Sequence, residues 1–295
     1  MRVGYYPGCS LESTARDYAE SVEGVAGLLE IELCPVPDWN CCGASAAHSL
    51  DHRLSLNLGA RNLALAAGGP QPVVVPCALC FNRLKTAQAE LAQDSSLVHP
   101  EVAALGRDWD KAEVVELVEF LTGPELRRQV QEAARHSLAG LDPVCYYGCQ
   151  GQRPPWITGN PEYESPRSMD RLLAELGAGV RDWAGKTECC GASHAVAQPE
   201  LVDELVARLY RQALEAGANC IVTGCQMCQA NLDLYQERIG ARLEQEVYLP
   251  VFYFTELMGL ALGHPQAATW LSRHMVDPRA LLARTQLPPQ SWERL

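Results

Sequence analysis

The cysteine doublet in "WNCCG" at residues 39–43 occurs a second time, as "ECCG" at residues 188–191. In both places glycine follows the doublet, and 34 residues separate its second cysteine from a C-x-x-C pair, at 77–80 and at 225–228. A lone C-x-x-C pair arises easily by chance, but the same elements in the same order at the same spacing do not. The pattern therefore indicates an internal duplication in which each copy is centred on thiols.

An aromatic, strand-like run precedes each doublet and also ends in cysteine. "VGYYPGC" closes on Cys9, and "VCYYGC" closes on Cys149. Each copy thus offers five cysteines in the same order. The first set is Cys9, Cys41, Cys42, Cys77 and Cys80, and the second set is Cys149, Cys189, Cys190, Cys225 and Cys228.

Short apolar runs alternate with amphipathic segments, which predicts an α/β fold with mainly parallel sheets flanked by helices. In such sheets ligands bind beyond the carboxyl ends of the strands, where the cysteines that follow strand-like runs would lie. Each copy is therefore expected to gather its thiols at one end of its own sheet. We expect strands at 2–6, 72–76, 144–147, 220–223 and 251–254, and helices at about 11–29, 50–67, 79–92, 167–177, 198–216 and 227–239.

The duplication divides the chain into two expected domains, 1–140 and 141–295. The stretch 93–143 links the copies, and its "AEVVELVEFLTG" matches "LPVFYFTELMGLALG" of the second copy in character. The tail "LPPQSWERL" at 287–295 is expected to be loosely ordered.

Composition narrows the class of protein. A chain of 295 residues with 47% apolar residues can bury one large core or two smaller ones without disulfide support. The net charge of -12 and the lack of a Lys/Arg cluster argue against a nucleic-acid surface. No signal peptide opens the chain, and the most apolar stretch is too short and too polar to span a bilayer. We expect a cytoplasmic protein with no direct membrane insertion.

The thirteen cysteines point to metal or redox chemistry, because an odd number in a cytoplasmic chain does not fit a disulfide framework. Successive side chains of an extended strand point to opposite faces, so both thiols of a doublet reach one centre only where the backbone turns. Gly43 and Gly191 permit that turn. Four thiolates suffice for zinc or for a conventional 4Fe-4S cluster, and five suggest a cluster of unusual type.

The pattern C-x31-CCG-x33-CxxC followed by C-x39-CCG-x33-CxxC resembles the tandem CCG domains of the heterodisulfide reductase B-subunit family, over nearly the whole chain. The resemblance implies that each domain holds a noncubane 4Fe-4S cluster through its five cysteines. It also implies that the two domains are related by a pseudo-twofold axis, with facing clusters that cleave, or in reverse form, a disulfide. The implied substrate is a small-thiol disulfide or a protein-borne dithiol. The implied partners in the same complex are a small ferredoxin-like protein and, beyond it, a flavoprotein.

Electron counting agrees with this implied reaction. Reduction of a disulfide takes two electrons, whereas an iron-sulfur cluster usually passes one, so two sites are needed. Two protons must follow, and His48 and His194 stand close to the two doublets. Imidazole titrates in the right range to donate protons, although the two positions do not align under the duplication. His48 and His194 are the candidate catalytic residues.

The remaining features are assigned to structure or to partners. Cys145 and Cys220 lie on strand-like runs and are expected to be buried apolar thiols, while Cys34 is expected in a loop. The sequence has neither a G-x-G-x-x-G nucleotide motif nor a C-x2-C-x2-C ferredoxin run. Electrons must therefore come from a partner protein.

Two other functions stay open. The chain is an electron-transfer or docking component of a complex linked to quinones or to sulfur oxidation, without disulfide chemistry, or it is a zinc-stabilised scaffold. For the cofactors, one 4Fe-4S cluster plus zinc is the alternative to two noncubane clusters. Sets of five thiols fit zinc poorly, because zinc closes with four ligands.

Overall fold

Two parallel β-sheets form the framework of the protein, a computed structural model that describes residues 1–44, 46–106, 108–244 and 246–293. The first sheet has the strand order β2-β1-β3-β4 and the second the order β5-β6-β7, with every neighbouring pair parallel. The expected α/β class is therefore confirmed. The strands are β1 (Arg2–Tyr5), β2 (Glu32–Pro35), β3 (Val73–Val75), β4 (Val114–Glu116), β5 (Pro143–Tyr146), β6 (Cys220–Thr223) and β7 (Val251–Tyr253).

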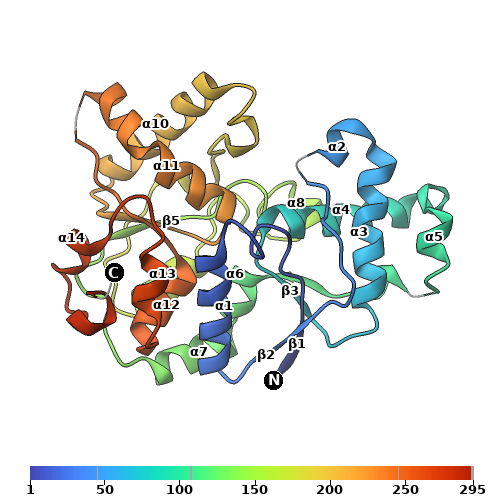
Figure 1. The fold of residues 1–295 in the computed structure, drawn as a ribbon, viewed down its shortest axis with the longest axis horizontal. Coiled ribbons are helices and arrows are strands. Elements are labelled where there is room, and N and C mark those ends of the chain that lie inside the picture. Colours follow the sequence, from blue (N-terminus) through green and yellow to red (C-terminus); the bar gives the residue numbers. More distant parts are fainter. Residues whose placement is uncertain (45, 107, 245, 294–295) are drawn as a thin grey trace.

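Helices flank both sheets, and the six expected ones are present (Figure 1). The expected helix at 50–67 begins at His52, because the side chain of Asp51 accepts the backbone N–H of Leu54 and caps it. The helices are α1 (Arg16–Leu28), α2 (Ala47–Leu50), α3 (His52–Ala66), α4 (Ala78–Gln93), α5 (Pro100–Ala103), α6 (Leu117–Leu121), α7 (Pro124–Ala133), α8 (Pro155–Thr158), α9 (Ser168–Glu175), α10 (Pro199–Glu215), α11 (Gln226–Leu243), α12 (Phe254–Leu262), α13 (Ala267–Leu271) and α14 (Arg279–Leu282).

The two sheets repeat one order of elements. Strands β1, β3 and β4 correspond to β5, β6 and β7, and both β4 and β7 lead directly into a short helix, α6 or α12. The linking stretch thus resembles the second copy because each contains a strand that leads into a short helix. At the edge where the first sheet carries β2, the second has only an isolated parallel bridge between Arg181 and Val144.

The hydrophobic residues form three clusters. One lies within the first copy around β3, α3 and α4, and another lies around β6, α10 and α11 of the second copy and also includes Ala78 of the first. The third cluster is central and combines residues of both expected domains, including Val3 and Val25 from the first and Leu257 and Leu282 from the second. Figure 1 shows the corresponding arrangement, with α1 beside α12 and α13. The two copies therefore share a core.

Specific contacts support this central core. The rings of Tyr18 and Tyr253 stack with centroids 4.2 Å apart, and the Tyr18 hydroxyl donates to Gly224 O at 2.9 Å. Trp270 lies so close to both α1 and α12 that a Cβ at Gly24 or Gly259 would be 2.7 or 2.4 Å from its ring. These contacts join the copies through close packing rather than through a flexible hinge.

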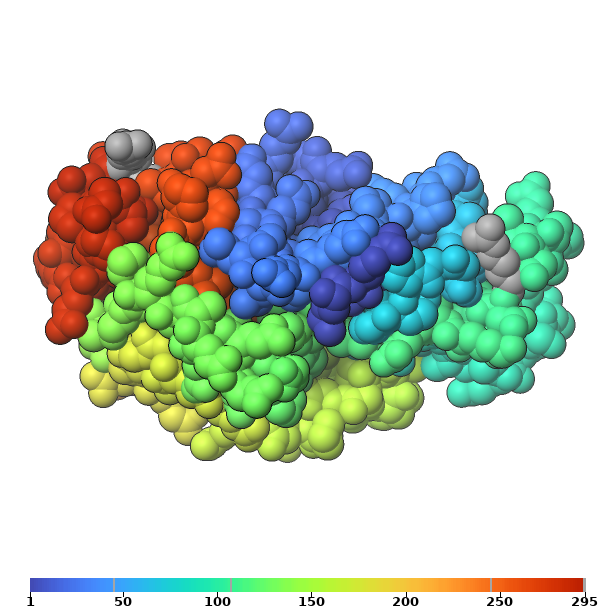
Figure 2. All heavy atoms as spheres, turned by 90° about the horizontal axis from the view of Figure 1, so that it is seen from below, coloured from blue at the N-terminus to red at the C-terminus, as the bar shows by residue number. Residues whose placement is uncertain are grey.

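The C-terminal segment belongs to the same core. Leu287 and Trp292 are buried there, and Trp292 Nε1 donates to Leu287 O. The expectation of a loosely ordered tail is wrong for 287–293, because these two apolar side chains anchor it; 294–295 lie outside the described residues. Figure 2 shows this C-terminal region at one end of the molecule, with the green linking stretch running along the same face.

None of the helices in the described ranges is both long enough and apolar enough to cross a bilayer.

Candidate metal centres

The C-x-x-C pairs lie at helix starts that directly follow the central strands. Cys77 is the N-cap of α4 and follows β3, and Cys225 is the N-cap of α11 and follows β6. The backbone N–H of Cys80 donates to Cys77 Sγ at 3.4 Å. Helix N-termini present unpaired N–H groups and a partial positive charge, which stabilise thiolates. The expected position of these thiols at the carboxyl ends of the strands is thus observed.

The glycine after each doublet has the same conformation and the same contact in both copies. Gly43 and Gly191 have φ values of 74° and 79°, in the left-handed region. Their N–H groups donate to the first sulfur of the doublet, at 3.5 Å for Cys41 and 3.3 Å for Cys189. The glycine therefore both turns the chain and donates a hydrogen bond to a candidate ligand.

Each set of five divides into an outer pair and three inner thiols. In the first copy the outer sulfurs of Cys9 and Cys41 lie 3.7 Å apart. Cys149 and Cys189 form the corresponding outer pair of the second copy, where the Cys149 thiol lowers the pKa of Cys189. Cys9, Cys41 and Cys189 are exposed, Cys149 is half-buried, and the inner thiols Cys42, Cys77, Cys80, Cys190, Cys225 and Cys228 are buried. Both sites thus open to solvent on the outer side.

Contacts between inner thiols join the doublet to the C-x-x-C pair. The sulfurs of Cys42 and Cys80 lie 3.3 Å apart, and those of Cys190 and Cys228 lie 3.7 Å apart. The structure therefore brings together the elements that the spacing predicted, in both copies. Whether the ten thiols bind metal stays a prediction at this point.

A second glycine in each copy, which the sequence reasoning did not single out, faces the inner thiols. Gly8 and Gly148 have φ values of 74° and 68°. A Cβ at Gly8 would lie 2.8 Å from Cys80 Sγ, and one at Gly148 would lie 3.1 Å from Cys228 Sγ. Both positions therefore need glycine for conformation and for space. The signal was present in the sequence, since glycine precedes cysteine in both "PGC" and "YGC".

A buried tyrosine holds each doublet from behind. The Tyr6 hydroxyl donates to Asn40 O at 2.8 Å, and the Tyr146 hydroxyl donates to Glu188 O at 2.7 Å. Asn40 and Glu188 are the residues immediately before the two doublets. This paired contact fixes the chain at the point where it enters the candidate metal centre.

Hydrogen bonds between thiols favour ionisation at one sulfur of each doublet. The hydrogen bond from Cys41 is the main cause that lowers the pKa of Cys42 to about 3. The hydrogen bond from Cys149 is the main cause that lowers the pKa of Cys189 to about 6. Because the thiolate is the form that binds metal, Cys42 and Cys189 favour the ligand state, whereas the same hydrogen bonds raise the pKa values of their partners Cys41 and Cys149.

The sulfur positions fit a cluster of several metal ions better than a single ion. Four thiolates around one zinc, each about 2.3 Å from it, would lie about 3.8 Å from one another. Among the residues in the described ranges, the only group of three or more His, Cys, Asp or Glu ligand atoms within 4.8 Å of one another is Asp17, Glu256 and His274. A cluster of several metal ions at either set of thiols stays a prediction.

The two candidate histidines are both exposed. His194 ends the short 3-10 helix Ala192–His194, and its charge contributes to the lowered pKa of Cys189, after the larger effect of Cys149. His48 is exposed on α2, beside Ala47, whose N–H donates to Gly43 O. A role of either histidine in proton transfer stays a prediction.

The three unpaired cysteines lie outside both sets. Cys145 and Cys220 are fully buried in β5 and β6, which confirms that they are buried thiols. The expectation for Cys34 was wrong, since it lies in β2 at the edge of the first sheet and not in a loop. Strand β2 pairs with β1 in parallel. A strand was not expected here because prolines stand at 35 and 37, and proline cannot donate a ladder hydrogen bond.

A buried carboxyl between the copies was also missed. Glu116 ends β4, and a Cβ at Gly151 of the second copy would lie 2.4 Å from Glu116 Oε1. Burial is the main cause that raises the pKa of Glu116 to about 8, with further contributions from Glu119 and Cys77. The sequence signal was only an acidic residue at the end of a strand, which is more often exposed.

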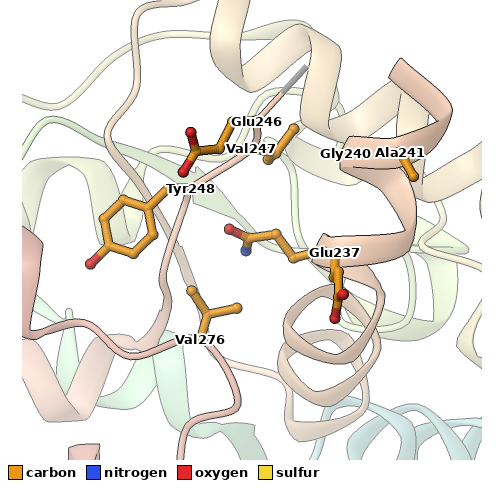
Figure 3. A pocket seen from close by; sticks show the side chains of 8 residues that line it. Glu237, Gly240, Ala241, Glu246, Val247, Tyr248 and Val276 are labelled. Carbon is orange, nitrogen blue, oxygen red and sulfur yellow. The ribbon is translucent and has the colours of Figure 1, made fainter. Parts of the chain in front are cut away.

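One cavity of about 350 Å³ lies away from the thiols, at the end of α11 (Figure 3). Glu237, Glu246, Tyr248 and Val276 are among its lining residues, and no cysteine lines it. The candidate centres are therefore distinct from this cavity.

Comparison with known proteins agrees with the geometry. The CCG cysteine-rich domain family matches residues 3–85 and 144–233, which are the two copies. The chain belongs to this family, whose tandem members include the B subunits of heterodisulfide reductases. The two copies found by the sequence pattern are thereby confirmed.

Two relatives cover almost the whole chain. The chain is 32% identical to the 8-methylmenaquinol:fumarate reductase membrane anchor subunit of Wolinella succinogenes, over 94% of this chain and 98% of that protein. It is 26% identical to the B subunit of the ferredoxin:CoB-CoM heterodisulfide reductase of Methanosarcina mazei, over 96% of both chains. These relatives support an iron-sulfur component of an oxidoreductase complex.

One solved structure shares the fold. A hypothetical protein from Helicobacter pylori superimposes with a TM-score of 0.71 at 10% sequence identity, over 93% of this chain. The chain spans 52% of that protein's length. At this identity the match shows the fold alone.

Proposed function

We propose that the protein is the iron-sulfur component of a heterodisulfide reductase-like complex, in which it cleaves, or in reverse forms, a disulfide. The observation that carries this proposal is the complete set of five thiols in both copies, with the same division into outer and inner thiols. An electron-transfer site needs only four thiolate ligands. A fifth thiol at both sites favours chemistry at the centre over simple electron passage.

Each set would hold one noncubane 4Fe-4S cluster, with Cys9, Cys41, Cys42, Cys77 and Cys80 at the first and Cys149, Cys189, Cys190, Cys225 and Cys228 at the second. Each cluster, when bound, supplies one electron at a time, and iron offers a position for a substrate sulfur. The two domains that carry them are residues 1–140 and 141–295 in this proposal.

The protein's own residues would orient and protect these centres. The inner thiols are held at the starts of α4 and α11, in the packed core of each copy. The outer thiols face solvent, so a disulfide would approach from that side. Cleavage consumes two electrons and two protons and releases two thiols. His48 and His194 are the proposed proton donors, since both are exposed and each follows a doublet closely in the sequence.

The substrate would be a small-thiol disulfide or a protein-borne dithiol. Because the chain has no nucleotide-binding motif of its own, electrons would come from partners in the complex, a ferredoxin-like protein and beyond it a flavoprotein. The relative from Methanosarcina mazei, named as one component of a ferredoxin-dependent reductase, supports this assignment.

A second function is supported by another relative. The protein from Wolinella succinogenes is named as a membrane anchor subunit of a fumarate reductase that uses 8-methylmenaquinol. In this alternative the chain passes electrons or docks a quinone-linked complex, and neither centre contacts a disulfide.

Iron analysis and electron paramagnetic resonance separate these functions. Protein purified without oxygen should contain about eight irons per chain and little zinc. Addition of a thiol or disulfide at controlled potential should change the spectrum, because sulfur binds at a centre. An iron-loaded protein that responds to no thiol but is reduced by a quinol would favour the second function. Two zinc ions without iron would exclude both.

A further inference from the structure

The two candidate centres differ at one contact that crosses between the copies. Gln226 follows Cys225 at the start of α11, and its Nε2 donates to Cys77 Sγ of the first copy at 2.8 Å. The side chain is 3% exposed, so water does not compete for this hydrogen bond. The amide thus belongs to one copy in the chain and acts on the centre of the other.

The duplication lacks the reciprocal contact. The residue that corresponds to Gln226 is Ala78, which follows Cys77 at the start of α4. A methyl group cannot donate a hydrogen bond, so the side chain at this position gives Cys225 no donor. Gln226 Oε1, moreover, is buried without a hydrogen-bond partner among the described residues. A buried amide that leaves its oxygen unpaired carries a cost that packing alone does not explain.

A second difference also concerns the charge next to the first centre. Arg83, one turn after Cys80 on α4, has a buried Nε that makes no hydrogen bond to any described residue. It stands three positions after the inner thiol Cys80 on the same helix, so the two side chains are neighbours on one helix face. The corresponding residue of the second copy is Asn231, a neutral side chain that donates to Cys190 O at 2.7 Å. At this position the first copy therefore has the positively charged Arg83, whereas the second copy has the neutral Asn231, whose side chain binds the backbone.

Both features stabilise added negative charge at the first centre. A reduction adds an electron, and the reduction potential of an iron-sulfur centre rises with hydrogen bonds to its sulfurs, with nearby positive charge and with solvent exposure. The outer thiol Cys9 is exposed whereas Cys149 is half-buried, which acts in the same direction. Two features act on the second centre. Gln150 Nε2 donates to Cys149 Sγ, but at the longer distance of 3.8 Å and in a partly buried position, and His194 is exposed, so water screens it.

We propose that Gln226 and Arg83 make the two centres unequal, so that the first centre has the higher reduction potential and holds the first electron. The inference rests on the proposed function, because it requires an iron-sulfur cluster at each set of thiols. Gln226 is a positioning residue in this proposal, since it acts through the Cys77 sulfur. Two electrons would then be stored in a fixed order, the first at the centre of the first copy and the second at the other.

A redox titration followed by electron paramagnetic resonance tests this order on the iron-loaded full chain. The unmodified protein should show two separate one-electron steps. Gln226→Leu, which keeps a similar volume without a donor, should lower the reduction equilibrium constant of the higher-potential step about tenfold, or about 59 mV, and leave the lower step in place. Arg83→Met should lower the same step. Met227→Leu, at the next position of α11, is the matched control and should move neither step.

The outcomes separate this inference from the proposed function. If both variants keep their iron and neither moves the higher step, or if they move the lower step instead, the inference is overturned and the proposed function stands. If the unmodified protein binds zinc and no iron, both are overturned. Should Gln226→Leu fail to fold, Arg83→Met decides the question, since it gives up a weak contact from Nη2 to the neighbouring Asn82 Oδ1 at 3.3 Å and no hydrogen bond from Nε among the described residues.

Discussion

The two thiol sites share a framework but differ in what surrounds it. Both have a glycine donor to the first sulfur of the doublet, a tyrosine behind the doublet and a helix start under the C-x-x-C pair. Only the first site receives a side-chain amide from the other copy, as far as the described residues show. The comparison teaches that both copies kept the contacts which hold the candidate ligands, while a contact between the copies became unequal because Ala78 stands where the second copy has Gln226.

The largest expected effect comes from removing one ligand at a time. Cys42→Ser should lose the iron of the first site, and Cys190→Ser that of the second, so each variant should retain about four of about eight irons. Disulfide turnover should be abolished in both, because the reaction needs two electrons from two sites. Iron analysis and turnover measurements check this.

The matched control is Cys220→Ala, a buried thiol outside both sets. It should keep all of its iron and lose only packing stability. Loss of both clusters from each single ligand variant would contradict independent sites.

The next effect concerns the buried carboxyl of the linking stretch. Glu116 occupies the end of β4, where the second copy has Tyr253 at the end of β7. Burial raises its pKa to about 8, so the folded chain holds a proton that the unfolded chain releases near pH 4.5. Stability from this group is therefore full below about pH 4.5 and is lost as the pH rises towards 8.

Glu116→Gln removes this titration. Between pH 5 and 8 the free energy of unfolding of the unmodified protein should fall by about 2 to 4 kcal/mol more than that of the variant. Denaturant unfolding at both pH values measures it. Glu113→Gln, an exposed acid just before β4, is the control and should leave the slope nearly unchanged. Parallel pH profiles for Glu116→Gln and the unmodified protein would contradict a raised pKa.

The glycines that face the inner thiols offer a graded comparison. Gly8→Ala should destabilise the protein by about 1–3 kcal/mol, because it places a Cβ at positive φ. Gly148→Ala should cost less, since its Cβ would lie 3.1 Å rather than 2.8 Å from the inner sulfur. Measuring the unfolding free energy and the retained iron of both variants shows which substitution costs more.

A control for these glycines is Gly217→Ala. Gly217 also has a positive φ, of 75°, but a Cβ there meets nothing within 4 Å among the described residues. It should show the conformational cost and retain iron. An equal loss of iron in all three variants would mean that contact with the sulfur does not matter.

The smallest effect is expected at the tyrosines behind the doublets. Asn40 O accepts from Asn62 Nδ2 as well as from Tyr6, whereas no donor to Glu188 O other than Tyr146 is found in the described ranges. Tyr146→Phe should therefore cost about 1–2 kcal/mol and Tyr6→Phe about half as much. Thermal or denaturant unfolding compares them, with Tyr235→Phe on the partly exposed face of α11 as the control. The reverse order would show that Asn62 does not compensate.

The sequence predicted most of the fold where local patterns were strong. The six long helices and the central strands follow apolar periodicity, and their ends moved by only a few residues, as at Asp51, where a capping side chain decided the start. Strand β2 was missed because "ELCP" is short, lies at an edge and has no alternating pattern. The packed tail was missed because the burial of Trp292 depends on a surface that distant segments build.

The sequence by itself determined the duplication, the two sets of five thiols and the glycine that turns each doublet, because these depend on residue identity and spacing along the chain. The tertiary structure decided which thiols face solvent and that one core joins the copies. It also decided that Gln226 reaches Cys77, 149 positions away in the chain. Such contacts arise from the packing of one copy against the other, and the repeat pattern within each copy carries no information about that packing.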